Sequence, residues 1–116
     1  MQHRIEEYKF GKIVIAGKAY SSDLIITPRG VLSPWWRGEG HLLKLKDFGE
    51  LKNSDIEYVV IGTGYNGMME VLEEVTDYFK AKGVKVYIAD TRKAVELYNI
   101  LVEEGRRVLG AFHLTC

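Results

Sequence analysis

The chain has 116 residues, of which 47% are apolar and 28% charged, as expected for one soluble globular domain with a single core. Sixteen basic residues balance sixteen acidic ones, so no net positive field favours nucleic acid or an anionic membrane surface. No apolar run approaches the roughly 20 residues of a membrane span. Residues 1–7 have no apolar signal region and the single cysteine is Cys116, so we expect a cytoplasmic protein. Scarce Asn and Gln beside plentiful Lys and Glu also resemble the composition of heat-adapted proteins.

The first half of the chain contains short segments rich in β-branched and aromatic residues, separated by glycine, serine and proline. Segments this close together can pair only through hairpins, which predicts an antiparallel β-meander. The expected strands are residues 4–10, 12–16, 23–27 and a short one at 31–33. An irregular loop over residues 34–41 and a helical turn over residues 47–52 follow.

From residue 56 the hydrophobic pattern predicts alternating strands and helices. Strands are expected at residues 56–61, 84–89 and 107–113; one helix starts at Met68 and ends near Gly83, and the next has Thr91 as N-cap and ends at Gly105. Such a βαβαβ unit makes the first two strands parallel and leaves the direction of the last open. The fold class is therefore α/β: a single domain, residues 1–116, in which the meander packs with the βαβαβ unit around a mixed central sheet.

A glycine-rich turn follows the strand at residues 56–61, with glycines at positions 62, 64 and 67. Glycines in a strand-to-helix turn can cradle a phosphate, and Asp90 could then hold a ribose hydroxyl. However, Asp90 lies 28 positions after Gly62, against about 20 in the dinucleotide fingerprint. A small anion on the amides of residues 62–68 remains one interpretation, and a tight turn without a ligand is the other.

Trp35 and Trp36 are adjacent and precede Arg37. Two neighbouring side chains on extended backbone cannot both point into one core, so we expect one tryptophan to be buried and the other partly exposed. Tryptophan and arginine are enriched at interface hot spots, and Trp36 is the one we expect at the surface. The alternative is that both pack beneath the loop.

His113 and Cys116 lie three positions apart. A zinc site would need about four ligands, and no second Cys/His pair accompanies them, so we expect neither a metal nor a cofactor. A nucleophilic cysteine would need a thiolate-stabilising environment that a chain end rarely offers. No set of nucleophile, base and orienting group is recognisable, which favours a non-catalytic protein over an enzyme.

Several segments together resemble a known family. The C-terminal run contains the pattern Tyr-Asn…Glu-Gly-Arg…His-x-Thr-Cys over residues 98–116, and the other matching positions are Ile61-Gly62-Thr63-Gly64, Tyr20, Asp23, Ile25, Pro28 and Trp36. With these the chain resembles the domain-of-unknown-function 498 family, the Mth-type domain shared with mitochondrial complex I assembly factor 3 and the adipogenesis-associated Mth-domain protein. The resemblance implies one α/β domain with an added β layer. The resemblance implies no catalytic residues, and the named eukaryotic members of that family act in protein assembly or regulation.

The carboxyl ends of parallel strands share one edge of a sheet, where ligands tend to bind. We expect that edge to hold the candidate site, with the loop at residues 35–37 above it. Its expected residues are Trp36, Arg37, Gly62, Thr63, Gly64, Asp90, Thr91, Arg92 and His113. We expect a non-catalytic interaction or assembly-type protein with a protein partner; the alternative is a small-ligand-binding domain that recognises an anionic or phosphate group at the Gly62–Gly67 turn.

Overall fold

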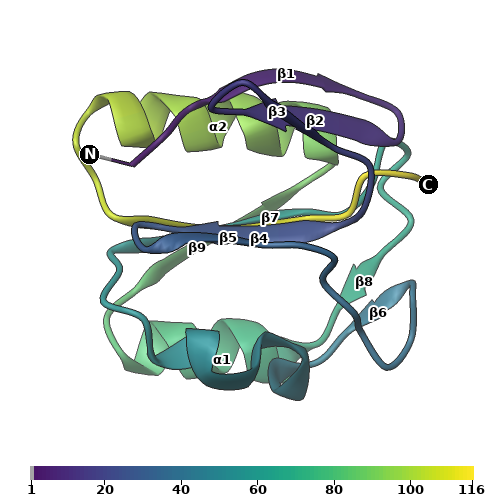
Figure 1. Ribbon diagram of the computed structural model, residues 1–116. Helices are drawn as coiled ribbons and strands as arrows, with labels where there is room; N and C mark the ends of the chain where they lie inside the picture. Colours follow the sequence, from purple (N-terminus) through teal and green to yellow (C-terminus); the bar gives the residue numbers. More distant parts are fainter. Residues whose placement is uncertain (1) are drawn as a thin grey trace.

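The computed structural model describes residues 2–116, which form three layers, and a five-stranded sheet is the middle layer (Figure 1). Its strand order is β5-β4-β10-β7-β9. The bounds are β4 (Leu24–Thr27), β5 (Gly30–Leu32), β7 (Tyr58–Gly62), β9 (Lys85–Ala89) and β10 (Val108–Phe112). β7, β9 and β10 are parallel, whereas β4 runs antiparallel to β10 and forms a hairpin with β5. The expected α/β fold with a mixed central sheet is confirmed, and the last strand is parallel to its neighbour.

One face of the sheet is covered by α2 (Thr91–Glu103) and by a separate antiparallel sheet, seen together above the central sheet in Figure 1. That sheet consists of β1 (Ile5–Lys9), β2 (Lys12–Ile15) and β3 (Lys18–Tyr20). Ile5, Ile13 and Ile15 pack with Tyr98 of α2 in one buried cluster. The expected meander is thus divided, because β1–β3 pack on α2 while β4 and β5 extend the central sheet.

The opposite face is covered by α1 (Glu73–Ala81) and the 3-10 helix η1 (Leu45–Asn53). Phe48 of η1 and Phe79 of α1 pack edge to face, with ring centroids 5.4 Å apart, in a second buried cluster. Alternate residues of β7 enter different clusters, Val60 the first and Val59 the second. This explains why β7 and β10 are almost continuously apolar.

The helix expected from Met68 begins later, at Glu73. Residues 69–72 are held extended because main-chain N–H groups donate across to other segments: Met69 to Thr63, Glu70 to His41 and Leu72 to Leu43. The last two contacts accompany a short parallel pairing of β6 (Leu42–Leu43) with β8 (Glu70–Val71). Within residues 2–116, no helix has the length and apolar character to cross a membrane.

Candidate functional site

The carboxyl ends of β7, β9 and β10 meet at one edge of the sheet, on the right in Figure 1. Gly62 is in register with Ala89 on one side and Phe112 on the other. Thr63, Asp90 and His113, the next residues of the three strands, therefore begin side by side. The structure brings the glycine turn, Asp90–Arg92 and His113 together at this edge.

Two glycines of this turn, Gly62 and Gly64, are required by close packing against the chain itself. A Cβ at Gly62 would lie 2.8 Å from Oγ1 of Thr91 and 2.9 Å from the ring of Phe112. Gly64 has φ +113°, and a Cβ there would lie 2.6 Å from the carbonyl oxygen of Thr115. Neither position has room for a side chain, so both glycines have a structural explanation without a ligand.

The main-chain amides of residues 63–69, which include all but the first of those expected to hold an anion, donate within the chain. The N–H groups of Thr63, Gly64 and Gly67 donate to Ala89, Thr91 Oγ1 and Gly64, while those of Tyr65, Asn66, Met68 and Met69 donate to Thr115, Cys116, Cys116 and Thr63; every distance lies between 2.8 and 3.3 Å. An anion at this turn would have to displace the C-terminal segment, defined here as residues 113–116. Moreover, the turn does not lie at the start of α1, so the dipole of that helix cannot assist it.

Thr91 has a different role from the helix cap expected for it. The N-cap of α2 is Asp90, whose carboxylate accepts from the N–H of Lys93 at 3.2 Å. The Thr91 hydroxyl is fully buried, donates to the carbonyl oxygen of His113 at 2.6 Å and accepts from the N–H of Gly64. Thr91 therefore joins all three strand ends. Arg92 lies with its guanidinium 4.4 Å from the ring centre of Tyr65.

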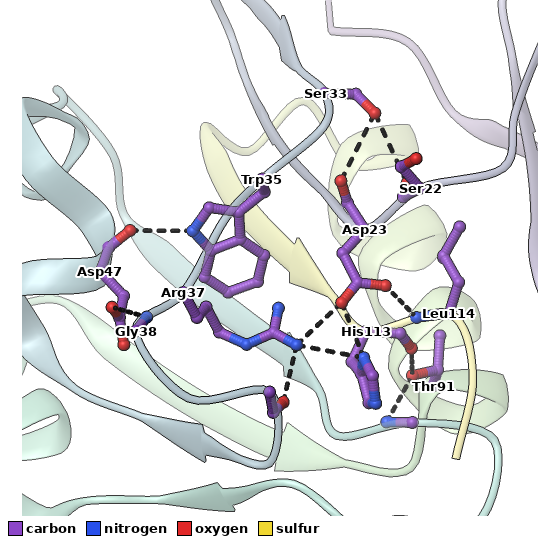
Figure 2. Close-up of polar contacts among 12 residues, drawn as sticks. Ser22, Asp23, Ser33, Trp35, Arg37, Gly38, Asp47, Thr91, His113 and Leu114 are labelled. Carbon is purple, nitrogen blue, oxygen red and sulfur yellow. Dashed lines mark hydrogen bonds and ion pairs between the residues drawn. The ribbon is translucent and has the colours of Figure 1, made fainter.

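Asp23, Arg37 and His113 form a compact ionic cluster beside this edge (Figure 2). Oδ2 of Asp23 lies 2.7 Å from Nδ1 of His113 and 2.8 Å from Nη2 of Arg37. The two hydrogens of that Nη2 are used by Asp23 and by the carbonyl oxygen of Gly40, also at 2.8 Å. Nδ1 of His113 therefore carries a proton and donates it to Asp23, and the 3.2 Å approach of Arg37 to Nδ1 is a contact without a shared proton.

This cluster stabilises the ionised form of Asp23. Burial alone would raise the pKa of its carboxyl, but the hydrogen bonds from His113 and from the N–H of Leu114, the charge of His113 and the hydrogen bond from Arg37 together hold that pKa below its ordinary value. The C-terminal segment is also held by Tyr8, whose hydroxyl donates to the carbonyl oxygen of Leu114 at 2.8 Å. Burial raises the pKa of Tyr8 to about 12.

Trp35 and Trp36 are divided between core and surface as expected. Trp35 is 4% exposed, and its Nε1 donates to the carbonyl oxygen of Asp47 at 2.8 Å. The Arg37 guanidinium stacks on the Trp35 ring at 4.7 Å (Figure 2). Trp36 is 81% exposed. It lines a groove of about 490 Å³ with Leu32, Pro34, Trp35, Lys46, Asp47, Phe48, Gly49, Glu50 and Leu51, so it lies apart from the glycine turn.

The Asp23–His113 pair has the geometry of a carboxylate that orients an imidazole, an arrangement that could support base catalysis. However, Nε2 of His113 is buried and has no hydrogen-bond partner among residues 2–116, nor do Nε and Nη1 of Arg37.

A cavity of about 540 Å³ lies at the other end of the strands, where Thr27 ends β4 and Arg107 precedes β10. Residues 2–116 also contain no cluster of metal-ligating side chains. The contacts among Asp23, Arg37 and His113 link the start of β4, the loop before β6 and the end of β10.

Residues 5–113 match the model of a family described as "Protein of unknown function (DUF498/DUF598)". Among solved structures, the conserved hypothetical protein PH1505 from Pyrococcus horikoshii OT3 is 27% identical, with a TM-score of 0.76, 97% of this chain covered and 99% of that one. The protein MT938 is 26% identical, with a TM-score of 0.81 and coverages of 98% and 99%. A structure described as an outer membrane protein from Bartonella henselae is 25% identical, with a TM-score of 0.83 and coverages of 99% and 97%.

Proposed function

Since the chain belongs to the DUF498/DUF598 family of proteins of unknown function, we propose from its own geometry that it is a non-catalytic interaction or assembly-type protein that docks a partner at Trp36. The observation that carries this proposal is the exposure of Trp36 between two anchored neighbours. A large aromatic side chain that is 81% exposed is uncommon unless a partner covers it, because tryptophan is highly buried on average.

The loop that presents Trp36 is fixed in place. The N–H of Trp35 donates to the carbonyl oxygen of Asp23 at 2.8 Å, and the Arg37 side chain is bound to Asp23 and Gly40. The N–H of Gly38 donates to the carboxylate of Asp47 at 3.1 Å. Because the neighbours of Trp36 fix the main chain of this loop, little backbone freedom is lost when a partner binds, and this increases the affinity that the loop can supply.

The groove beside Trp36 indicates what kind of partner fits. Leu32 and Pro34 line it with exposed apolar surface, and Lys46 and Glu50 supply charges of both signs. Apolar side chains with charged groups of both signs beside them are usual at protein interfaces. The partner is therefore a protein segment that places an apolar side chain against Trp36, and residence in the cytoplasm is part of the same proposal. The anion-binding alternative has less support, because the amides at the glycine turn are already hydrogen-bonded.

Replacing Trp36 by alanine tests the proposal. Immobilised wild-type protein, Trp36→Ala and the control Ile100→Ala, which changes an exposed apolar residue of α2, are compared for capture of polypeptides from a cell extract. Any polypeptide retained by the wild type and the control but lost by Trp36→Ala is then purified. We expect its Kd for Trp36→Ala to be at least about 30-fold weaker, because a hot-spot tryptophan contributes about 2 kcal/mol or more.

The same variants separate binding from folding. Trp36→Ala should unfold within about 0.5 kcal/mol of the wild type in denaturant, since an exposed side chain contributes little to stability. If Trp36→Ala retains every polypeptide that the wild type retains, Trp36 is not the docking residue and the proposed function fails.

A further inference from the structure

The two outermost strands of the central sheet, β5 and β9, differ in how their free sides are protected against pairing with another strand. β5 is only three residues long, and Pro28 precedes it while Pro34 follows it. Prolines beside an outermost strand hinder its pairing with a further strand. β9 has five residues, Lys-Val-Tyr-Ile-Ala, without proline or a bulge. Its Tyr87 is 41% and its Ile88 46% exposed. A regular, apolar and exposed edge strand is a template for another strand.

The hydrogen bonds of β9 show which main-chain groups are free to pair. The N–H of Lys85 donates to Glu57 at 3.1 Å, and the carbonyl of Ala89 accepts from Thr63 at 2.9 Å. Since alternate residues of a strand bond to the same side, Lys85, Tyr87 and Ala89 face β7. The N–H and C=O groups of Val86 and Ile88 therefore point away from the sheet.

We propose that the chain forms a symmetric dimer in which β9 of two copies pair antiparallel, with the two-fold axis at Tyr87. In this register Val86 of each copy lies opposite Ile88 of the other and exchanges both hydrogen bonds with it. All four outward main-chain groups of each strand are then paired, and the two five-stranded sheets become one continuous sheet.

Side chains on both faces suit this arrangement. The ring of Tyr87 stacks on that of Tyr58, with centroids 6.1 Å and planes 19° apart. In the dimer, the stacked Tyr58–Tyr87 pairs of the two copies therefore lie next to each other at the two-fold axis, on the α2 face. Val86 and Ile88 alternate with Tyr87 and meet on the other face. Lys85 lies opposite Ala89 of the second copy and one residue from its Asp90. No like charges therefore oppose each other across the pair, as cross-strand pairing requires.

The molecular mass in solution tests the dimer. Sedimentation equilibrium across a concentration series should give twice the chain's 13.2 kDa. Because residue 87 faces itself across the axis, Tyr87→Lys and Tyr87→Glu should each weaken the dimer at least about tenfold through like charges. An equimolar mixture of the two variants should restore the dimer, since Lys then faces Glu. Ile100→Lys, on α2, should stay dimeric.

Cysteine cross-linking tests the register in protein that keeps its charge. In a Cys116→Ser background, Tyr87→Cys should form a disulfide-linked dimer with oxidised glutathione, because directly opposed residues have Cα atoms about 4.5–5.5 Å apart. Ile88→Cys should not, since its counterpart is displaced along the strand by two residues. Circular dichroism checks that each variant is folded.

Three outcomes would overturn the proposal: a monomeric wild type throughout the series, a dimer that Tyr87→Lys and Tyr87→Glu leave unchanged, or cross-linking through Ile88→Cys instead of Tyr87→Cys. None of these depends on whether Trp36 binds a partner, so the dimer and the proposed function succeed or fail separately.

Discussion

Asp23 joins three segments that are far apart in the sequence. Its carboxylate binds Arg37 of the loop before β6, His113 at the end of β10 and the N–H of Leu114. The family resemblance included Asp23, but no local pattern gave it a partner, since Asp23 and His113 are 90 positions apart. Ion pairs between distant segments depend on the completed sheet, here on the pairing of β4 with β10.

The lowered pKa of Asp23 makes the protein sensitive to acid. Because this pKa lies below its ordinary value of 3.8, the unfolded chain takes up a proton first as the pH falls. The stabilisation from Asp23 is present above pH 3.8 and is lost as the pH falls through the pKa of the folded state. Asp23→Asn should therefore be less stable near neutral pH by about 1–3 kcal/mol, and the difference should shrink in acid.

Urea unfolding of the wild type and Asp23→Asn at several pH values measures this difference. Asp55→Asn is the matched control, because the Asp55 side chain is almost fully exposed and forms only a long ion pair with Arg107. A difference between the wild type and Asp23→Asn that stays constant or grows as the pH falls would show that Asp23 does not stabilise the fold as an ion.

At the scale of elements, the strand before the glycine turn was predictable, whereas the start of α1 was not. Met68 and Met69 fit the apolar spacing of a helix, but residues 69–72 instead bond to Thr63 and to the segment around β6. These contacts override the local helical preference. The glycines similarly fit a phosphate-binding pattern, and only the completed fold shows the C-terminal segment lying against them.

Two glycines with positive φ, Gly83 after α1 and Gly64 in the glycine turn, should differ in what alanine costs there. Gly83→Ala, at φ +78° with open space around it, should cost about 1 kcal/mol, because left-handed strain is partly offset by a less flexible unfolded chain. Gly64→Ala should cost at least about 3 kcal/mol, because its Cβ also meets the C-terminal segment. Denaturant unfolding measures both, and equal costs would mean that the C-terminal segment does not pack on the turn.

At the scale of the whole molecule, hydrophobic periodicity was enough to predict the βαβαβ unit and the mixed sheet. Periodicity is a local property, so it could not decide that β10 lies between β4 and β7 or that β1–β3 leave the central sheet for α2. The same limit applies to the site. The strand ends were expected at one edge, but the hydrogen bonds that occupy the amides there come from the C-terminal segment.

Whether this edge is closed to anions is tested most directly by nuclear magnetic resonance. ¹⁵N-labelled protein is titrated with inorganic phosphate and with ATP, and the amide signals of residues 63–69 are followed. Because these N–H groups are already donated within the chain, their chemical shifts should stay constant and they should exchange slowly with solvent. Saturable shifts confined to these amides would contradict this and would make anion binding at the glycine turn the better account of the protein.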